Sequence, residues 1–548
     1  MFNNQTTMFL RQRWKVWYLV ILPYLLFAVY SAVSIPPLQA GDRTNVPLKN
    51  WGGFSLFRSW VYDALEKIVL AGLADQALLN TKPLSRMEAA RIVAQAIHKL
   101  EQDYGDYNDR NYLEDLLYKL IEEFGSELAE MGVKTPLNYE AKPKFLNLKP
   151  VDNIQFGNAL ANNPQKPVNN FGRRFSEGIN TDFTFDGRNQ LGDFLSLYYQ
   201  PEFFLNKDGS QGRLQIGYAK LTLWNTELEV GRDSLWWGPG YHGSMLFSNN
   251  AAPLDQVRLG SAEPFRLPWI FRHIGPIKAT TFVGKLDGNQ TPSHPLVGGY
   301  RISLAPSRFV EIGHGRAYQF AGDGRGYTIK DFPGTIFQTT TSEGVDDPDS
   351  NRNVNNLLSL DITVRIPNVD RYIFIARDIS LYGEMGWDDT QKGWIYPKQP
   401  GGIVGTYLTG FLGDPKLDFR LEYAKSTPIM FTHNNIYENG FIYRDSVLSH
   451  FIGTDGSELY ARLSRWIHED ILLGFQASRA EIGTTQHDLV GKLPHEKRYS
   501  FGLDVSYQVS DRSSIFLEYD FSRITNHDFV SGERENNHLF RFEFTYSL

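Results

Sequence analysis

The residue types best suited to binding chemistry lie in one short stretch, residues 231–254. Within it, Trp236 and Trp237 precede a Gly-Pro-Gly turn, and Tyr241 and His242 follow that turn. Proline fixes its own φ and glycine permits positive φ, so the sequence predicts a sharp turn here. Aromatic rings can stack on the C–H faces of sugars, and His, Asn and Arg side chains can hydrogen-bond hydroxyl and carboxylate groups.

The same sequence offers little for catalysis or metal binding. It has no Cys and neither a Gly-x-Ser-x-Gly nor a His-Glu-x-x-His motif. His468, Glu469 and Asp470 lie in a polar stretch typical of an exposed turn. The acidic stretch 346–353 lacks the turn glycine and distal Glu of a calcium loop. We therefore predict no enzyme activity, no cofactor and no bound metal.

The composition favours a mainly β protein that is exported. The 548 residues are 14% aromatic and include 48 glycines, which indicates many strands and turns. A mean hydropathy of −0.35 excludes a polytopic helical membrane protein, whereas a barrel hides its apolar residues in alternation. The formal net charge of −7 argues against nucleic acid as a partner.

The last strand-like segment indicates what kind of sheet this is. As an edge strand in water, a segment so apolar on one face and charged on the other would aggregate. In a closed barrel its apolar face meets lipid and its charged face meets the lumen. The residues that point one way are Phe540, Phe542, Phe544, Tyr546 and Leu548; those that point the other way are Arg541, Glu543, Thr545 and Ser547.

The length of the β region gives an approximate strand number. Residues 150–548 contain recurring strand-like pieces separated by turn signals. At roughly 22 residues for a strand and its connection, this region holds about 18 strands, an even number as bacterial barrels require. A β-propeller or β-helix would show a fixed-period repeat, and none is visible. We predict a transmembrane antiparallel β-barrel of about 18 strands over residues 150–548.

Residues 41–149 are of a different kind and predict a small helical bundle with a linker. Apolar residues recur at helical spacing between residues 51 and 132. Gly72 is placed to end one helix, and Ser85 with Glu88 forms a capping box that begins the next. Three short amphipathic helices are expected, forming a periplasmic module.

The first 40 residues predict an export signal. Arg11, Arg13 and Lys15 are followed by an uncharged stretch, and Leu38-Gln39-Ala40 offers a cleavage site before Gly41. An uncleaved membrane anchor is the alternative.

The tryptophan turn and several later stretches resemble the Wzi-type capsule assembly family of Gram-negative outer-membrane barrels. The resemblance implies an 18-stranded outer-membrane barrel with an N-terminal helical region. It also implies a lectin-like protein that binds and organises capsular or other long surface polysaccharide without catalysis. The matching stretches are Ser248-Asn249-Asn250-Ala251, Glu263-Pro264-Phe265, Leu267-Pro268-Trp269, Gly275-Pro276 and the block from Tyr443 to Arg462.

This resemblance makes nine residues candidates for polysaccharide contact. The alternative is architectural: aromatics form interface girdles in membrane barrels, and the tryptophan turn can plug the lumen. A different function, a porin or sugar-conducting channel tethered to the cell wall, also remains open. The nine candidates are Trp236, Trp237, Tyr241, His242, Asn249, Asn250, Arg258, Trp269 and Arg272.

The helical module carries a second resemblance. Residues 60–97 resemble a single S-layer-homology repeat, through Leu65, Ile68, Gly72 and the stretch from Pro83 to Ala89. Such modules bind cell-wall polymers, so the resemblance implies peptidoglycan as a further partner beside surface polysaccharide and the outer-membrane bilayer. The alternative is a structural cap on the barrel.

Overall fold

The computed structural model describes most of the chain outside the first 40 residues. The described residues are 41–48, 60–75, 77–102, 111–137, 145–325, 354–388, 399–432, 436–484 and 494–548, with short pieces at 390–391 and 396–397. The predicted export signal, the acidic stretch 346–353 and part of the predicted linker lie outside these residues.

The β region forms a closed antiparallel barrel of 18 strands, as predicted. Each strand pairs with the next barrel strand along the chain, and β24 closes the cylinder against β2, with Phe544 opposite Phe156. The first barrel strand begins at Leu146, slightly before the predicted start at residue 150. The barrel strands are β2 (Leu146–Ala161), β3 (Gly178–Leu191), β4 (Leu195–Asn206), β5 (Gly209–Leu223), β6 (Thr226–Asp233), β8 (Leu254–Ser261), β9 (Ile277–Lys285), β10 (Leu296–Ser307), β11 (Val310–Phe320), β12 (Asn355–Ile366), β13 (Asp378–Trp387), β16 (Gly401–Thr409), β17 (Leu417–Lys425), β20 (Gly456–His468), β21 (Ile471–Ile482), β22 (Glu496–Ser510), β23 (Ser513–Thr525) and β24 (Arg534–Ser547).

The two faces of the wall alternate as the last strand predicts. On β24, Phe540 is 48% exposed and its neighbour Arg541 is 2% exposed. The same alternation recurs on β17, where Leu421 and Tyr423 are exposed and Glu422 between them is buried. Apolar side chains therefore cover the outside of the cylinder, and charged side chains face its lumen.

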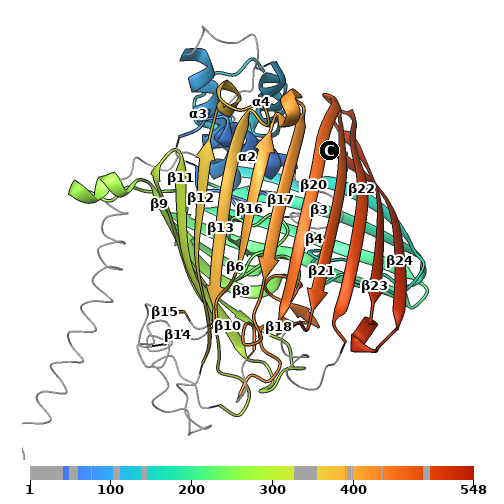
Figure 1. The fold of residues 1–548 in the computed structure, drawn as a ribbon. Helices are drawn as coiled ribbons and strands as arrows, with labels where there is room; N and C mark the ends of the chain where they lie inside the picture. Colours follow the sequence, from blue (N-terminus) through green and yellow to red (C-terminus); the bar gives the residue numbers. More distant parts are fainter. Residues whose placement is uncertain are drawn as a thin grey trace, which may run out of the picture.

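The two ends of the barrel differ. At one end, the short-turn end, strands are joined by turns such as 192–194, 224–225 and 469–470. At the other, the long-loop end, connections such as 162–177, 234–253 and 426–455 are longer. The helices gather at the short-turn end (Figure 1), where Lys119 Nζ donates a hydrogen bond to the carbonyl of Glu469.

The helical module follows the predicted local signals. Gly72 has φ +78° after α2, and the Glu88 N–H donates to Ser85 Oγ at 3.1 Å at the start of α3. The Glu88 carboxylate forms an ion pair with Lys278 of β9, with Oε2 and Nζ 2.6 Å apart. This ion pair joins the helical module to the barrel wall. No described helix has the length and apolarity needed to cross a bilayer. The helices are α2 (Trp60–Leu70), α3 (Arg86–Gln102), α4 (Asn111–Glu123) and a short α5 (Gly125–Glu130) that the sequence did not predict.

Among the described residues, short elements lie in the connections. Three are two-stranded sheets: β1 (Thr81–Lys82) with β7 (Trp236–Trp237), β14 (Thr390–Gln391) with β15 (Tyr396–Pro397), and β18 (Ile442–Tyr443) with β19 (Ser446–Val447). Four are 3₁₀ turns: η2 (Trp269–Ile274), η3 (Val369–Arg371), η4 (Phe411–Gly413) and η5 (His527–Phe529).

Candidate functional site

The connection between β6 and β8, residues 234–253, folds back into the barrel; we call it the tryptophan loop. Its strand β7 pairs with β1 of the helical module, with Thr81 opposite Trp237 and Lys82 opposite Trp236. The N–H of Gly238 also donates to the carbonyl of Asn80 at 2.9 Å. The predicted turn is therefore a contact between the barrel and its N-terminal module.

Both tryptophans are fully enclosed. Trp236 and Trp237 are each 0% exposed. The Trp236 indole N–H donates to the carbonyl of Gly240 at 3.0 Å. The Trp237 ring meets Phe247 and Phe282 edge-on, with centroid distances of 5.1 and 5.4 Å. These rings fill an interior rather than offering a stacking face to solvent.

Carboxylates of the wall hold the tryptophan loop in the lumen. Glu422 of β17 accepts hydrogen bonds from the backbone N–H groups of Tyr241 at 2.7 Å and His242 at 3.1 Å. Glu384 of β13 accepts one from the N–H of Met245 at 3.1 Å. These hydrogen bonds satisfy buried N–H groups that would otherwise lack acceptors, so the loop is anchored along its inner edge.

His242 belongs to a buried imidazole cluster. Its Nδ1 lies 2.9 Å from Glu458 Oε2, and its ring stacks on Tyr460 at 4.0 Å. His450 also approaches Glu458, with Nε2 at 3.8 Å. Burial lowers the pKa of His450 to about 4, against the opposing effect of Glu458. The N–H of Ile452 donates to His450 Nδ1 at 3.3 Å, as a neutral ring allows.

Asn249, Asn250 and Arg258 tie interior segments together. Asn249 Nδ2 donates to the carbonyl of Leu48 at 3.1 Å, and Asn250 Nδ2 donates to that of Val447 at 3.0 Å. Arg258 Nη2 lies 2.5 Å from Glu229 Oε2. These three side chains are more than nine-tenths buried.

Trp269 and Arg272 lie elsewhere. Both belong to η2 in the connection between β8 and β9, at the short-turn end. The structure thus brings seven of the nine candidates together in the lumen and places two at the end opposite the long loops. The contacts of the seven buried residues are those of the alternative that the sequence left open, in which they pack the lumen of the barrel. Direct sugar contact by any of the nine stays a prediction.

The sequence-based candidates do not include an exposed surface at the long-loop end that could bind a ligand. The β18–β19 hairpin presents Arg444 and Asp445 in its turn, both exposed. Arg174 Nη2 lies 3.0 Å from Asp445 Oδ2, and Lys166 Nζ donates to the Asp445 carbonyl at 2.6 Å. Burial and the neighbouring Arg174 lower the pKa of Lys166 to about 8. We call Lys166, Arg174, Arg444 and Asp445 the outer basic surface.

The ring of Tyr443, which is 3% exposed, lies beneath this surface. The Arg444 guanidinium lies 5.1 Å from the centroid of the Tyr443 ring. The block from Tyr443 to Arg462 stands out in the sequence, but its partners Lys166 and Arg174 come from a distant loop. No local pattern signals that these segments meet.

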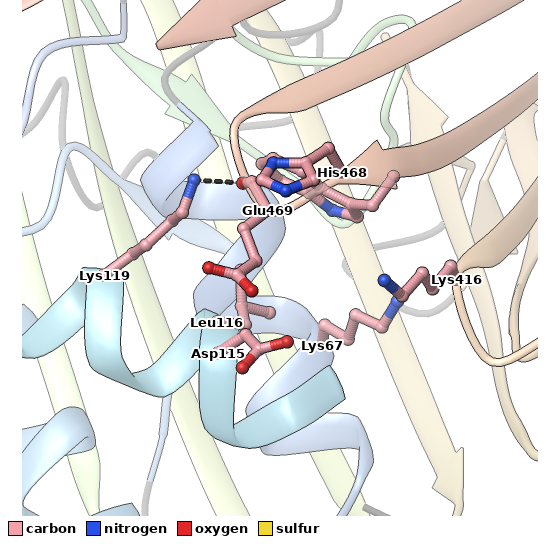
Figure 2. A pocket seen from close by; sticks show the side chains of 8 residues that line it. Lys67, Asp115, Leu116, Lys119, Lys416, His468 and Glu469 are labelled. Carbon is pink, nitrogen blue, oxygen red and sulfur yellow. Dashed lines mark hydrogen bonds between the residues drawn. The ribbon is translucent and has the colours of Figure 1, made fainter. Parts of the chain in front are cut away.

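A pocket opens between the helical module and the barrel at the short-turn end (Figure 2). Trp466 forms an aromatic wall, and Lys119 Nζ lies 5.0 Å from its ring centroid. Lys67, which also lines the pocket, is ion-paired with Asp418 at 2.9 Å. The remaining lining residues are Asp115, Leu116, Lys416, His468 and Glu469.

One group of described residues has ligand atoms close enough to hold a metal ion: Glu496, His527 and Asp528, at the long-loop end. Arg498 lies 3.6 Å from Glu496, and Glu535 lies 3.5 Å from His527.

Comparison with known proteins identifies the family. The model of the family described as capsule assembly protein Wzi matches residues 156–539. The chain belongs to the capsule assembly protein Wzi family. Wzi of Escherichia coli, described as a carbohydrate-binding β-barrel of the outer membrane involved in group 1 capsule assembly, has the same fold. It is 18% identical, with a TM-score of 0.66, over 89% of this chain and 98% of that chain.

A relative found by sequence matches a smaller part of the chain. An uncharacterised 55.8 kDa protein from the cps region of Klebsiella pneumoniae is 25% identical over 206 residues. That match spans 37% of this chain and 39% of the relative. Within the Wzi family, this chain has the fold of an outer-membrane β-barrel, as predicted.

Proposed function

We propose that this protein binds capsular or other long surface polysaccharide at the cell surface and organises it there without chemical turnover. Membership of the Wzi family supports a role in capsule assembly. The fold shared with a carbohydrate-binding barrel of Escherichia coli supports the ligand class. The observation that carries the proposal is the outer basic surface, where the guanidinium groups of Arg174 and Arg444 are exposed.

The orientation of the barrel is part of this proposal. Outer-membrane barrels carry short turns on the periplasmic side and longer loops outside. The long-loop end would then face the exterior, and the helical module would lie on the periplasmic side. This orientation places the outer basic surface at the cell surface and places Trp269 and Arg272 away from it.

The tryptophan loop then acts as a support for the surface above it. Its Ser248 N–H donates to the carbonyl of Leu448 at 2.9 Å, and Asn250 Nδ2 binds the carbonyl of Val447. These contacts hold the hairpin that carries Arg444. We propose that Arg444 and Arg174 bind carboxylates of acidic sugars, because guanidinium forms paired bonds with carboxylates.

Retention of polysaccharide on cells tests the proposal. A deletion strain is complemented with wild type, with the double variant Arg174→Ala/Arg444→Ala, or with Arg465→Ala. Arg465 is a matched control, since it is exposed and paired with Asp414 at 2.7 Å at the opposite end. We expect deletion and the double variant to shift polysaccharide from the cell-attached to the shed fraction. Unchanged retention after deletion would reject the assembly function.

Peptidoglycan is a further proposed partner, through the helical module. The pocket beside Trp466 supports it, because it opens between module and barrel on the proposed periplasmic side. Pull-down of the detergent-solubilised protein with purified peptidoglycan tests this, and absence of binding would leave the module as a structural cap.

A further inference from the structure

The most exposed large apolar side chains of the described residues lie at the short-turn end, beyond the barrel wall. Trp269 and Tyr372 are each 86% exposed, Phe374 is 79% and Ile270 is 72%. Runs of large apolar side chains this exposed are uncommon on a surface bathed in water, so each run calls for an apolar partner.

Two separate connections carry these side chains. The first is η2, which has no buried residue and stands out from the barrel wall (Figure 1). Its base is fixed at Gly275, where φ is +90° and a Cβ would collide with the carbonyl of Ala305 on β10. The second is the run 372–375 between β12 and β13, braced by a hydrogen bond from the N–H of Leu412 to the carbonyl of Ile375 at 2.9 Å.

Both structures continue the lipid-facing surface of the barrel. On β12, the outward residues Leu360, Ile362 and Ile366 lead to the run 372–375. On β8, outward Val257 and Leu259 lead to η2.

Cationic side chains lie beside each apolar group. Arg272 follows Phe271 in η2, and Arg371 precedes Tyr372; both arginines are exposed. Aromatic rings flanked by basic residues are typical of segments that lie at the boundary between acyl chains and headgroups.

We propose that η2 and residues 372–375 are interfacial anchors that insert into the membrane leaflet adjoining the short-turn end. The apolar side chains lie at the acyl boundary, and Arg272 and Arg371 contact phosphates of phospholipid headgroups. The identification of the lipid as phospholipid rests on the proposed orientation, in which this leaflet is periplasmic. The anchors are distinct from the glycan surface at the other end.

Site-directed spin labelling measures the depth of each anchor, and the absence of Cys makes every introduced thiol unique. Ile270→Cys and Phe374→Cys carry a nitroxide in vesicles of phosphatidylethanolamine and phosphatidylglycerol. Leu259→Cys on the wall is the hydrocarbon control, and Ser210→Cys on β5, beside the β4–β5 turn, is the aqueous control. We expect high access to oxygen and several-fold lower access to an aqueous nickel complex than at Ser210→Cys. Nickel access equal to that control at both sites would overturn the proposal.

Tryptophan quenching gives an independent measurement with a milder substitution. Brominated phospholipid should quench part of the wild-type emission, and Trp269→Phe should remove a share of that quenching. Trp466→Phe, at the same end but in the pocket of Figure 2, should leave it unchanged. Equal quenching in wild type and Trp269→Phe would also overturn the anchor.

Orientation is tested separately. An impermeant thiol reagent that labels Ser210→Cys on intact cells supports the proposed orientation. If that thiol is protected, the proposed orientation is wrong and the lipid assigned to the anchors changes. The measured depth of the anchors in the membrane would not be affected.

Discussion

His242 and Glu458 form a buried pair, with Nδ1 and Oε2 2.9 Å apart, that joins the tryptophan loop to strand β20. Both side chains are at most 2% exposed. The pair places an imidazole and a carboxylate where water cannot compensate either group.

The free energy of unfolding should decrease as the pH is lowered, because of the neighbouring His450. Its pKa is about 4 in the folded chain, below the ordinary value of 6.5, so the unfolded chain binds more protons between these values. Stability is then full above pH 6.5 and is lost as pH falls toward 4, by about 3 kcal/mol. Urea unfolding in micelles measures this. His450→Gln should flatten the dependence in this window, and an unchanged slope would contradict the assignment.

Glu422 should matter for the position of the tryptophan loop. Glu422→Ala leaves the buried N–H groups of Tyr241 and His242 without their acceptor, which costs about 2–5 kcal/mol. Glu422→Gln keeps an acceptor and should cost less. Limited proteolysis within residues 234–253, together with unfolding in denaturant, compares the two variants. Protection of the loop in Glu422→Ala equal to that in wild type would show that the carboxylate does not hold it.

Trp237→Ala should lower the stability of the protein and should not weaken glycan binding directly. The ring packs edge-on against Phe247 and Phe282, and removing such a buried side chain costs about 3–5 kcal/mol. Thermal unfolding is the measurement. Lost glycan binding at unchanged stability would instead put this indole on the ligand, as the sequence-based prediction had it.

Arg301 and Asp361 should behave as a buried ion pair that anchors the helical module. They lie 2.8 Å apart and are fully buried, and Arg301 Nε also donates to Thr81 Oγ1 at 2.7 Å. Arg301→Ala leaves a buried charge alone, at a cost of about 3–5 kcal/mol. The double variant Arg301→Met/Asp361→Leu should cost less. A double variant worse than the single one would contradict this account.

Planar bilayer recordings distinguish an anchor from a channel. With the tryptophan loop and the N-terminal module inside the lumen, wild type should show no steady conductance. The double variant Glu384→Gln/Glu422→Gln should open intermittently, because it weakens two contacts of the loop. A steady open pore in wild type would reject the anchor.

The wall of the barrel was predictable because its rules are local. Alternation along 540–548 assigns each side chain to lipid or lumen, and the cap at Ser85 depends only on the three residues that follow it. The strand number followed from length and typical spacing.

The site was harder to predict because its contacts are remote in sequence. The direction of the tryptophan loop depends on Glu422, 181 residues away from Tyr241. Arg174 and Asp445 are separated by 271 residues, yet they meet at the outer surface. A Gly-Pro-Gly turn indicates that the chain bends, but only distant carboxylates determine that it bends inward.

The pairing of β1 with β7 has a mechanical consequence. Main-chain hydrogen bonds join the N-terminal helices to a loop whose far side supports the β18–β19 hairpin. A force applied to the helices along the cylinder axis would therefore be transmitted through the interior to the opposite rim, and the surrounding wall would bear only part of the load.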